Sequence, residues 1–231
     1  MLTNHRRAFW YSLALLLSMA VVFLAVGRHP AGDAPATTLP IVGRWDLAIF
    51  HAMDDIRNTP LTWIARALNV IGGGVVTIPL RILVALWLMF RRRWRAFGTW
   101  ILTWVSAEVV LTGAKAFFHR GRPPDPVVAT IGHSFPSGHA VAGAATAVAL
   151  VLVMIPPGRA RRRWEIAAVA FAFVMALSRV YLDAHWFSDV VAGVLLGAGV
   201  ALGSAALTTE VRDIVMRRRA LTDTRADSPG G

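Results

Sequence analysis

The sequence predicts an all-α, polytopic membrane protein: a six-transmembrane-helix bundle with both termini in the cytoplasm. Three observations support this prediction. Hydrophobic residues make up 56% of the 231 residues, and the mean hydropathy is +0.55. Charged residues make up only 16%, which is too few for a soluble domain of this length. Finally, the arginines fall in short clusters between long apolar runs, a pattern that reports membrane topology.

Composition also excludes several classes of function. The formal net charge of +11 would suit a nucleic-acid-binding protein, but the arginine clusters flank apolar runs and do not form one basic face. We therefore expect the membrane bilayer, and no nucleic acid, as the partner of these basic residues. The chain has no cysteine, which excludes disulfides, thiol nucleophiles and cysteine-ligated metals.

The first predicted span covers residues 9–27 and follows the basic residues Arg6 and Arg7. A cleaved signal peptide is the alternative, because a basic start, an apolar run and the sequence "APA" at 34–36 would suit one. We favour a retained anchor, because the apolar run is long enough to cross a bilayer and the rest of the chain is itself membrane-embedded.

Residues 28–73 are predicted to form an extracytoplasmic or interfacial connection. Its first part is polar and proline-rich, and "WDLAIFHAMDDI" at 45–56 has the amphipathic pattern of a helix at the membrane surface. Residues 60–73 form a segment that is too short and too broken to cross the membrane alone. We expect this segment to be an interfacial or re-entrant helix.

Five further spans complete the predicted bundle, which is a single membrane domain over residues 1–231. They cover residues 74–90, 96–118, 138–155, 164–181 and 187–208, and residues 209–231 form a cytoplasmic tail. Six crossings place the basic clusters at 6–7, 91–95, 158–163 and 217–219 on one side of the membrane, whereas an odd number would divide these clusters. Because cytoplasmic loops carry the basic excess, we expect cytoplasmic termini in a multi-pass protein of the cell (inner) membrane.

Polar residues in and beside the spans converge on the extracytoplasmic side. A helix rises about 1.5 Å per residue, so Lys115 lies roughly 30 Å beyond Arg95, and Arg179 about 24 Å beyond Arg163. Both side chains therefore approach the outer face of a hydrocarbon core that is about 30 Å thick. The fourth and sixth spans begin at that same face. The predicted patch comprises Lys115, Arg120, Arg122, Ser137, Gly138, His139, Ser178, Arg179, His185 and Asp189.

The patch has the composition of a reaction centre for an anion. Guanidinium groups match phosphate oxygens, and the sequence "SGH" at the start of a helix adds free backbone N–H groups. Asp189 follows His185 by four residues, so its carboxylate can hold one ring nitrogen and leave the other free to attack. Each residue alone could be a helix cap or an interfacial anchor. Together they indicate phosphoryl transfer through a covalent histidine.

Three segments resemble the signature motifs of one known family. They are "KAFFHRGRP" at 115–123, "PSGH" at 136–139 and "SRVYLDAHWFSD" at 178–189. In order and spacing these segments are similar to the three motifs of the type 2 phosphatidic acid phosphatase (PAP2) superfamily. The layout of six spans also resembles the membrane branch of lipid phosphatases in that superfamily.

The resemblance implies a role for each matching residue. His185 would attack phosphorus and become a phosphohistidine, with Asp189 orienting its ring. His139 would protonate the leaving group and then help water to hydrolyse the intermediate. The resemblance also implies supporting roles for Arg120 and Ser178. The groups that would bind the phosphoryl oxygens belong to Lys115, Arg122, Ser137, Gly138 and Arg179.

Two positions depart from the family's pattern. Asp183 stands where a small residue is common, and Phe187 stands where proline is frequent. Neither change removes a catalytic group, but an extra acid near the phosphate site could shift substrate preference or pH optimum. The resemblance implies no metal and no cofactor, and the sequence has no carboxylate cluster of the kind that binds divalent metals.

These features predict an integral membrane lipid phosphatase with an extracytoplasmic (periplasmic) active site. Its substrate would be a phosphomonoester or pyrophosphate of a phospholipid or isoprenoid lipid. Examples are phosphatidic acid, phosphatidylglycerol phosphate, undecaprenyl pyrophosphate and lipid A phosphate. Vanadate-dependent haloperoxidases share the motifs, but they are soluble and usually much longer. An anion-binding transporter or channel would explain the cations but not the paired histidine and aspartate. No oligomeric state is predicted.

One further pair lies outside the motifs. Arg81 is ten residues before Arg91 and Glu108 is thirteen residues after Arg95, so their depths are about 15 and 20 Å above the cytoplasmic edge. An unpaired charge at such depth costs at least ~2.5–3.5 kcal/mol. We expect Arg81 and Glu108 to pair and to support the floor of the site.

Overall fold

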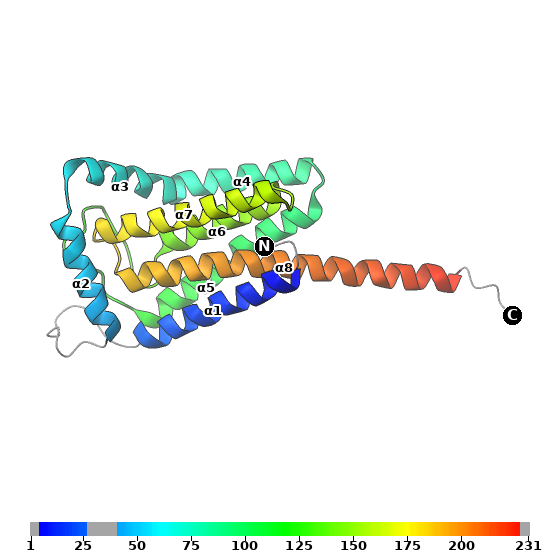
Figure 1. The fold of residues 1–231 in the computed structure, drawn as a ribbon, viewed down its shortest axis with the longest axis horizontal. Coiled ribbons are helices and arrows are strands. Elements are labelled where there is room, and N and C mark those ends of the chain that lie inside the picture. The colour runs from blue at the N-terminus through cyan, green and yellow to red at the C-terminus, as the bar shows by residue number, and fades with distance from the viewer. Residues whose placement is uncertain (1–4, 27–40, 227–231) are drawn as a thin grey trace.

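The computed structural model describes residues 5–26 and 41–226, and Figure 1 shows its fold. Within these ranges the chain forms eight helices and no strand, which confirms the predicted all-α class. The helices are α1 (His5–Val26), α2 (Ile41–Asp55), α3 (Thr59–Gly72), α4 (Gly74–Phe90), α5 (Trp94–Phe118), α6 (Gly138–Met154), α7 (Arg159–Tyr181) and α8 (Phe187–Ala226).

Not every helix is long and apolar enough to cross a membrane alone. Helices α1, α5, α7 and α8 each meet this requirement. Helices α3 and α4 meet it only together, and they are bent by 43° where they join. Helix α6 is apolar but has only 17 residues. The described residues therefore contain four candidate spans, or five if the bent pair is one span. Six crossings and cytoplasmic termini stay predictions.

The helices follow the predicted spans closely at α4 and α6 and depart from them most at α8. The sixth span was expected to end at residue 208; the candidate span in α8 ends at Val211, and the helix itself continues to Ala226. No glycine or proline occurs between Gly203 and Pro229 to interrupt it, so the helix outlasts the apolar run. Figure 1 shows this part of α8 projecting beyond the bundle. The candidate cleavage sequence at 34–36 lies outside the described residues.

Helix α1 packs along α8 as part of the bundle. The Ser12 hydroxyl donates a hydrogen bond to the backbone oxygen of Gly199 over 2.8 Å. Leu16 packs against a buried cluster that includes Leu196 and Val200 on α8. Helix α1 therefore packs as part of the bundle, and the retained anchor stays a prediction.

The backbones of α6 and α8 touch directly. A Cβ atom built on Gly193 would lie 2.8 Å from the backbone oxygen of Ser137, and one on Gly197 would lie 2.5 Å from that of Val141. Real Cβ atoms do not come so close, so α8 requires glycine at both positions. Small residues at a helix interface permit this approach. The helices that begin at Gly138 and Phe187 are therefore fixed relative to each other.

Helix α2 lies across one end of the bundle, at the left of Figure 1, where α7 ends and α8 begins. Its side chains Ile49 and Met53 pack against a buried cluster that includes Val180 and Val190. The segment expected to be amphipathic is thus a helix that covers this end. Helix α3 follows it and runs into α4 through the bend, the geometry of either a broken span or a re-entrant pair.

Candidate active site

The predicted polar patch lies at the end of the bundle that α2 covers. Helices α6 and α8 begin there, α5 and α7 end there, and the loop 119–137 and the turn 182–186 connect them. The helix ends bring residues that are far apart in the sequence to one place. The predicted residues found at this end are Lys115, Arg120, Arg122, Ser137, Gly138, His139, Ser178, Arg179, His185 and Asp189.

His185 and Asp189 form the centre of the site. The Nδ1 atom of His185 is 3.5 Å from Oδ2 of Asp189, whose side chain is 0% exposed. The same carboxylate oxygen accepts hydrogen bonds from the Ser134 hydroxyl and from the backbone N–H of Trp186, the latter over 2.9 Å. The carboxylate is thus held on one side of the imidazole. Its position favours the tautomer with the proton on Nδ1.

The ring of His185 is neutral near pH 7. Burial lowers the pKa of His185 to about 4, and the hydrogen bond and negative charge of Asp189 only partly oppose that effect. With the proton on Nδ1, the Nε2 atom carries a free lone pair. This atom faces the guanidinium of Arg122, with Nη1 3.3 Å away.

Neutral oxygen atoms hold Arg122 in place. Its Nε donates to the backbone oxygen of Gly132 over 3.0 Å, its Nη1 to that of Ala184 over 2.6 Å, and its Nη2 to that of Ile131 over 2.8 Å. Burial lowers the pKa of Arg122, while the charge of Asp189 has the opposite effect. The guanidinium is therefore fixed without a carboxylate bound to it.

Lys115 and Arg179 are held in the same way. The ammonium group of Lys115 donates to the backbone oxygen of His133 over 2.5 Å, and Nη1 of Arg179 donates to the side-chain oxygen of Asn69. Arg122 lies close enough to both cations to repel them. None of the three forms an ion pair with an acid in the described part of the chain. An anion placed among them would relieve this repulsion.

Ser137 does not act as a conventional helix cap. It occupies the N-cap position of α6, yet its hydroxyl makes no capping hydrogen bond and is buried without a partner among the described residues. Its backbone N–H donates to the backbone oxygen of Asp189 over 3.0 Å. A buried, unpaired hydroxyl at a helix start is available to an oxygen-rich ligand, beside the first backbone N–H groups of the helix from Gly138.

His139 lies beside helix α3. Its Nε2 atom is 3.2 Å from the backbone oxygen of Asn69, the residue whose side chain also accepts from Arg179. Asn69 therefore connects the predicted proton donor with a predicted phosphate ligand. Sequence reasoning missed Asn69, because nothing in its neighbourhood distinguishes it from any polar residue on an interfacial helix.

Two motif residues lie in other surroundings. The Ser178 hydroxyl donates to the backbone oxygen of Met175 over 2.7 Å, a bond within its own helix. Arg120 is buried and bridges Asp189 and Asp46, with 2.5 Å from Nη1 to Oδ1 of Asp189 and 2.6 Å from Nη2 to Oδ2 of Asp46. Asp46 is a second residue that the sequence did not reveal.

The expected ion pair between Arg81 and Glu108 does not form. The guanidinium of Arg81 lies over the ring of Trp104, 2.9 Å from the ring centroid, and Glu108 is exposed. No hydrogen bond joins the two side chains and no ion pair within 4.0 Å does, so the negative charge of Glu108 acts on Arg81 only from a greater distance. The reason is that Trp104 lies one turn before Glu108, where it meets the arginine first.

The two departures from the family pattern fall at the edge of the site. Asp183 has a positive φ of 52° and accepts from Nη2 of Arg57 over 2.5 Å. Burial raises the pKa of Asp183, and the charge of Arg57 lowers it in part. The acid therefore ties the turn before His185 to the corner between α2 and α3. Phe187 begins α8 and packs against the apolar cluster beneath α2.

In the described ranges, no group of three or more histidine, aspartate and glutamate side chains is arranged to hold a metal ion. The acids of the site are instead engaged by arginine, serine and histidine. The positive charge opposite His185 comes from the protein's own cations.

Comparison with known proteins agrees with the geometry. The PAP2 superfamily model matches residues 107–213. The chain is 26% identical over 201 residues to an undecaprenyl-diphosphatase of Sulfolobus acidocaldarius, covering 84% of this chain and 87% of that protein. It is 33% identical over 167 residues to a decaprenylphosphoryl-5-phosphoribose phosphatase of Mycobacterium tuberculosis, covering 67% of this chain and 76% of that protein.

A solved structure has the same fold. It is the transmembrane PAP2-type phosphatidylglycerolphosphate phosphatase of Bacillus subtilis, with a TM-score of 0.70 and 23% identity over 88% of this chain and 97% of that one. The family match and the 33% identity decide the assignment. The chain belongs to the PAP2 superfamily, and it is a hydrolase of phosphoric ester or pyrophosphate bonds.

Proposed function

We propose that this membrane phosphatase removes phosphate from an isoprenoid-lipid phosphate or pyrophosphate through a phosphohistidine on His185. One observation carries the proposal. Lys115, Arg122 and Arg179 are each held by neutral oxygens, Arg122 faces the free Nε2 atom of His185, and the charge of Arg122 repels both other cations. Such a cluster is balanced when a phosphoryl group lies among the three cations, directly in front of the nucleophile.

The first chemical step follows from this arrangement. The lone pair of His185 Nε2 attacks phosphorus while the bond from phosphorus to the leaving oxygen breaks, and His139 transfers a proton to that oxygen. Asp189 stabilises the positive charge that develops on the His185 ring. The cations, the Ser137 hydroxyl and the first N–H groups of α6 bind the phosphoryl oxygens as negative charge accumulates.

The second step returns the enzyme to its starting state. A water molecule gives a proton to His139 and attacks phosphorus, and the bond from phosphorus to His185 Nε2 breaks. Inorganic phosphate leaves with the oxygen of that water. His139 therefore acts first as an acid and then as a base, so it ends the cycle protonated again.

The proposed substrate class rests on the relatives and on the place of the site. The two relatives described above carry names of enzymes that act on polyprenyl lipids, and the solved structure carries that of a phospholipid phosphatase. A site at the end of a helix bundle lies where lipid head groups lie, so the lipid tail can remain in the bilayer.

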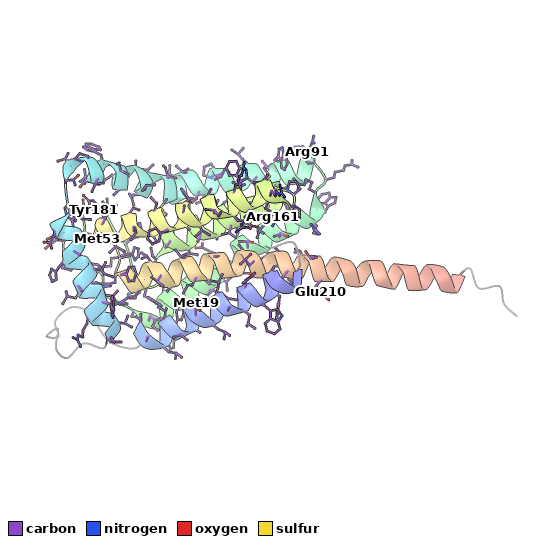
Figure 2. All side chains as sticks on the ribbon, in the orientation of Figure 1. Met19, Met53, Arg91, Arg161, Tyr181 and Glu210 are labelled. Atoms are coloured by element: carbon purple, nitrogen blue, oxygen red, sulfur yellow. The ribbon has the colours of Figure 1, made fainter. Side chains whose placement is uncertain are left out.

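The basic clusters support an extracytoplasmic site. Figure 2 labels Arg91 and Arg161 toward one end of the bundle and Tyr181 at the other, where the site lies. If α3 and α4 form one broken span and α6 is a short span, the chain crosses six times. The basic turns then face the cytoplasm and the site faces outward.

Phosphate release and intermediate trapping test the proposal. Purified protein in detergent should release phosphate from polyprenyl phosphates or pyrophosphates, and rapid quenching with labelled substrate should give an acid-labile, base-stable phosphoprotein. His185→Ala should abolish both signals. His51→Ala, which changes an exposed histidine on α2, should retain both. Normal phosphate release by folded His185→Ala would overturn the mechanism. Phosphate binding without hydrolysis of any lipid phosphate would instead indicate a transporter.

Inhibitors give a second test of the same chemistry. Vanadate can adopt the five-coordinate geometry of the phosphoryl group in transit, so it should inhibit hydrolysis. EDTA should not inhibit, because the site's positive charge comes from Lys115, Arg122 and Arg179. Recovery of EDTA-treated enzyme only when a divalent ion is added would contradict this account.

A further inference from the structure

Asp46 is the most deeply buried acid on the helix that covers the site. It is only 2% exposed, although most of α2 is accessible. Its Oδ1 accepts from the backbone N–H of Ser188 over 2.7 Å, and its Oδ2 accepts from the Ser188 hydroxyl over 2.7 Å. Ser188 lies in the first turn of α8, so this carboxylate sits at the positive end of the helix dipole.

The same carboxylate holds Arg120. Nη2 of Arg120 donates to Oδ2 of Asp46 over 2.6 Å, and Nη1 donates to Oδ1 of Asp189 over 2.5 Å. One buried guanidinium therefore joins two buried carboxylates. Removing one partner from such a group leaves the remaining charges incompletely paired, and that outcome is strongly unfavourable in a buried site.

This arrangement gives the two oxygens of Asp189 different partners. Oδ1 is bound by Arg120, whereas Oδ2 is bound by Ser134 and the N–H of Trp186 and faces Nδ1 of His185. Because Arg120 binds Oδ1 of Asp189, Oδ2 remains to face His185. Asp46 in turn decides where Arg120 lies.

We propose that Asp46 is a positioning residue for the phosphatase reaction: through Arg120 it fixes the Asp189 carboxylate and thereby the orientation and tautomer of His185. The inference rests on the proposed function of His185. It assigns α2 a part in the reaction, in addition to covering the end of the bundle.

The positioning role of Asp46 is separate from the contacts that attach α2 to the bundle. Ile49 and Met53 attach the helix to the bundle through apolar packing that does not involve Asp46. Asp46 contacts none of Lys115, Arg122 and Arg179 among the described residues, so its loss leaves the phosphate-binding cations in place. We therefore expect a change in the chemical step and little change in substrate binding.

Steady-state kinetics of Asp46→Asn test this expectation. The hydrogen bond lost is one to a charged group, so kcat should fall roughly tenfold or more while KM changes less than about twofold. Asp54→Asn is the matched control: it makes the same change on the same helix at a carboxylate that is 64% exposed. The control should keep both constants within about twofold of wild type.

A double-mutant cycle then separates positioning from structural support. If Asp46 acts through Asp189, Asp46→Asn should lower kcat by less than about twofold in an Asp189→Asn background. An equal fractional loss in both backgrounds, or an unchanged kcat in the single variant, would overturn the proposal. Should Asp46→Asn fail to fold, Asp46→Glu keeps the charge but displaces Arg120, and the same cycle applies.

The controls distinguish this inference from the proposed function. If the wild-type protein hydrolyses lipid phosphates and His185→Ala does not, the proposed function stands, and the Asp46 data alone decide the positioning role. If His185→Ala remains active, the proposed function fails first. A melting temperature measured for every variant shows that losses in kcat do not come from unfolding.

Discussion

Arg179 donates a hydrogen bond from Nη1 to the side-chain oxygen of Asn69, a residue 110 positions earlier in the chain. The backbone oxygen of the same asparagine lies 3.2 Å from Nε2 of His139. A single residue of α3 therefore contacts a phosphate-binding cation and the proton donor. Its neutral amide oxygen thus positions the arginine without neutralising its charge.

Two substitutions at Asn69 should have different effects. Asn69→Ala removes the bond that holds Arg179 in place, so KM should rise by a factor of roughly ten, the scale of one hydrogen bond to a charged group. Asn69→Asp places a carboxylate against Arg179 that competes with the phosphoryl group, so KM should rise further. KM measured on a lipid phosphate decides this. An aspartate variant with a lower KM than the alanine variant would contradict the arrangement.

Protein stability should depend on pH through His185. Its pKa falls to about 4 in the folded state, below the usual value of about 6.5. The neutral His185 ring therefore contributes its full share to the free energy of unfolding above pH 6.5. This contribution is lost as pH falls toward 4, and the loss is at most about 3 kcal/mol. Melting temperatures between pH 7 and pH 4 should show this decline. His185→Gln should lack that part of the decline, and an identical profile in both proteins would refute the assignment.

Loss of Trp104 should destabilise the protein more than loss of Glu108, because Trp104 is the contact partner of Arg81. A desolvated cation–π contact contributes about 2 kcal/mol, so Trp104→Leu should lower the melting temperature clearly. Glu108→Leu changes an exposed residue and should have a smaller effect. In Arg81→Leu protein, the effect of Trp104→Leu should shrink, because the contact is already absent. Equal losses from Trp104→Leu in both backgrounds would show that the contact carries no energy.

Single cysteines can test the sidedness, because the natural chain contains none. Ile131 is 90% exposed in the loop beside the site, and Arg91 is exposed at the opposite end. In intact cells, a membrane-impermeant maleimide should label Ile131→Cys. It should label Arg91→Cys only after the membrane is opened. The reverse pattern would place the site in the cytoplasm and would refute the six-crossing orientation.

The sequence predicted features that depend on position along one helix. Apolar runs bounded by arginine or glycine located α4 and α6, and a rise of about 1.5 Å per residue placed Lys115 and Arg179 at the same end. Asp46 and Asn69 could not be found in this way. Their partners lie 74 and 110 residues away, and only the packing of α2 and α3 on the bundle brings them together.

The error at Arg81 has a related cause. Depth alone paired it with Glu108, but Trp104 is nine residues after Arg95, about 14 Å above the same edge, and so matches the depth of about 15 Å more closely. Depth was estimated from charged residues alone, and an aromatic face was not considered as a partner. Both a carboxylate and the face of an aromatic ring can serve as the partner of an arginine in the bundle.

The active site is held together in two ways: α6 and α8 meet through direct backbone contact, whereas α2 and α3 join it through side chains. Gly193 and Gly197 fix the starts of those helices, and with them His139 and Asp189, at backbone level. Helices α2 and α3 reach the same site through the side chains of Asp46 and Asn69, and they lie outside the 107–213 segment that the family model matches. Exchanging residues 41–73 between relatives, with Asp46 and Asn69 retained, would therefore replace the cover and leave both side-chain connections to the catalytic residues in place.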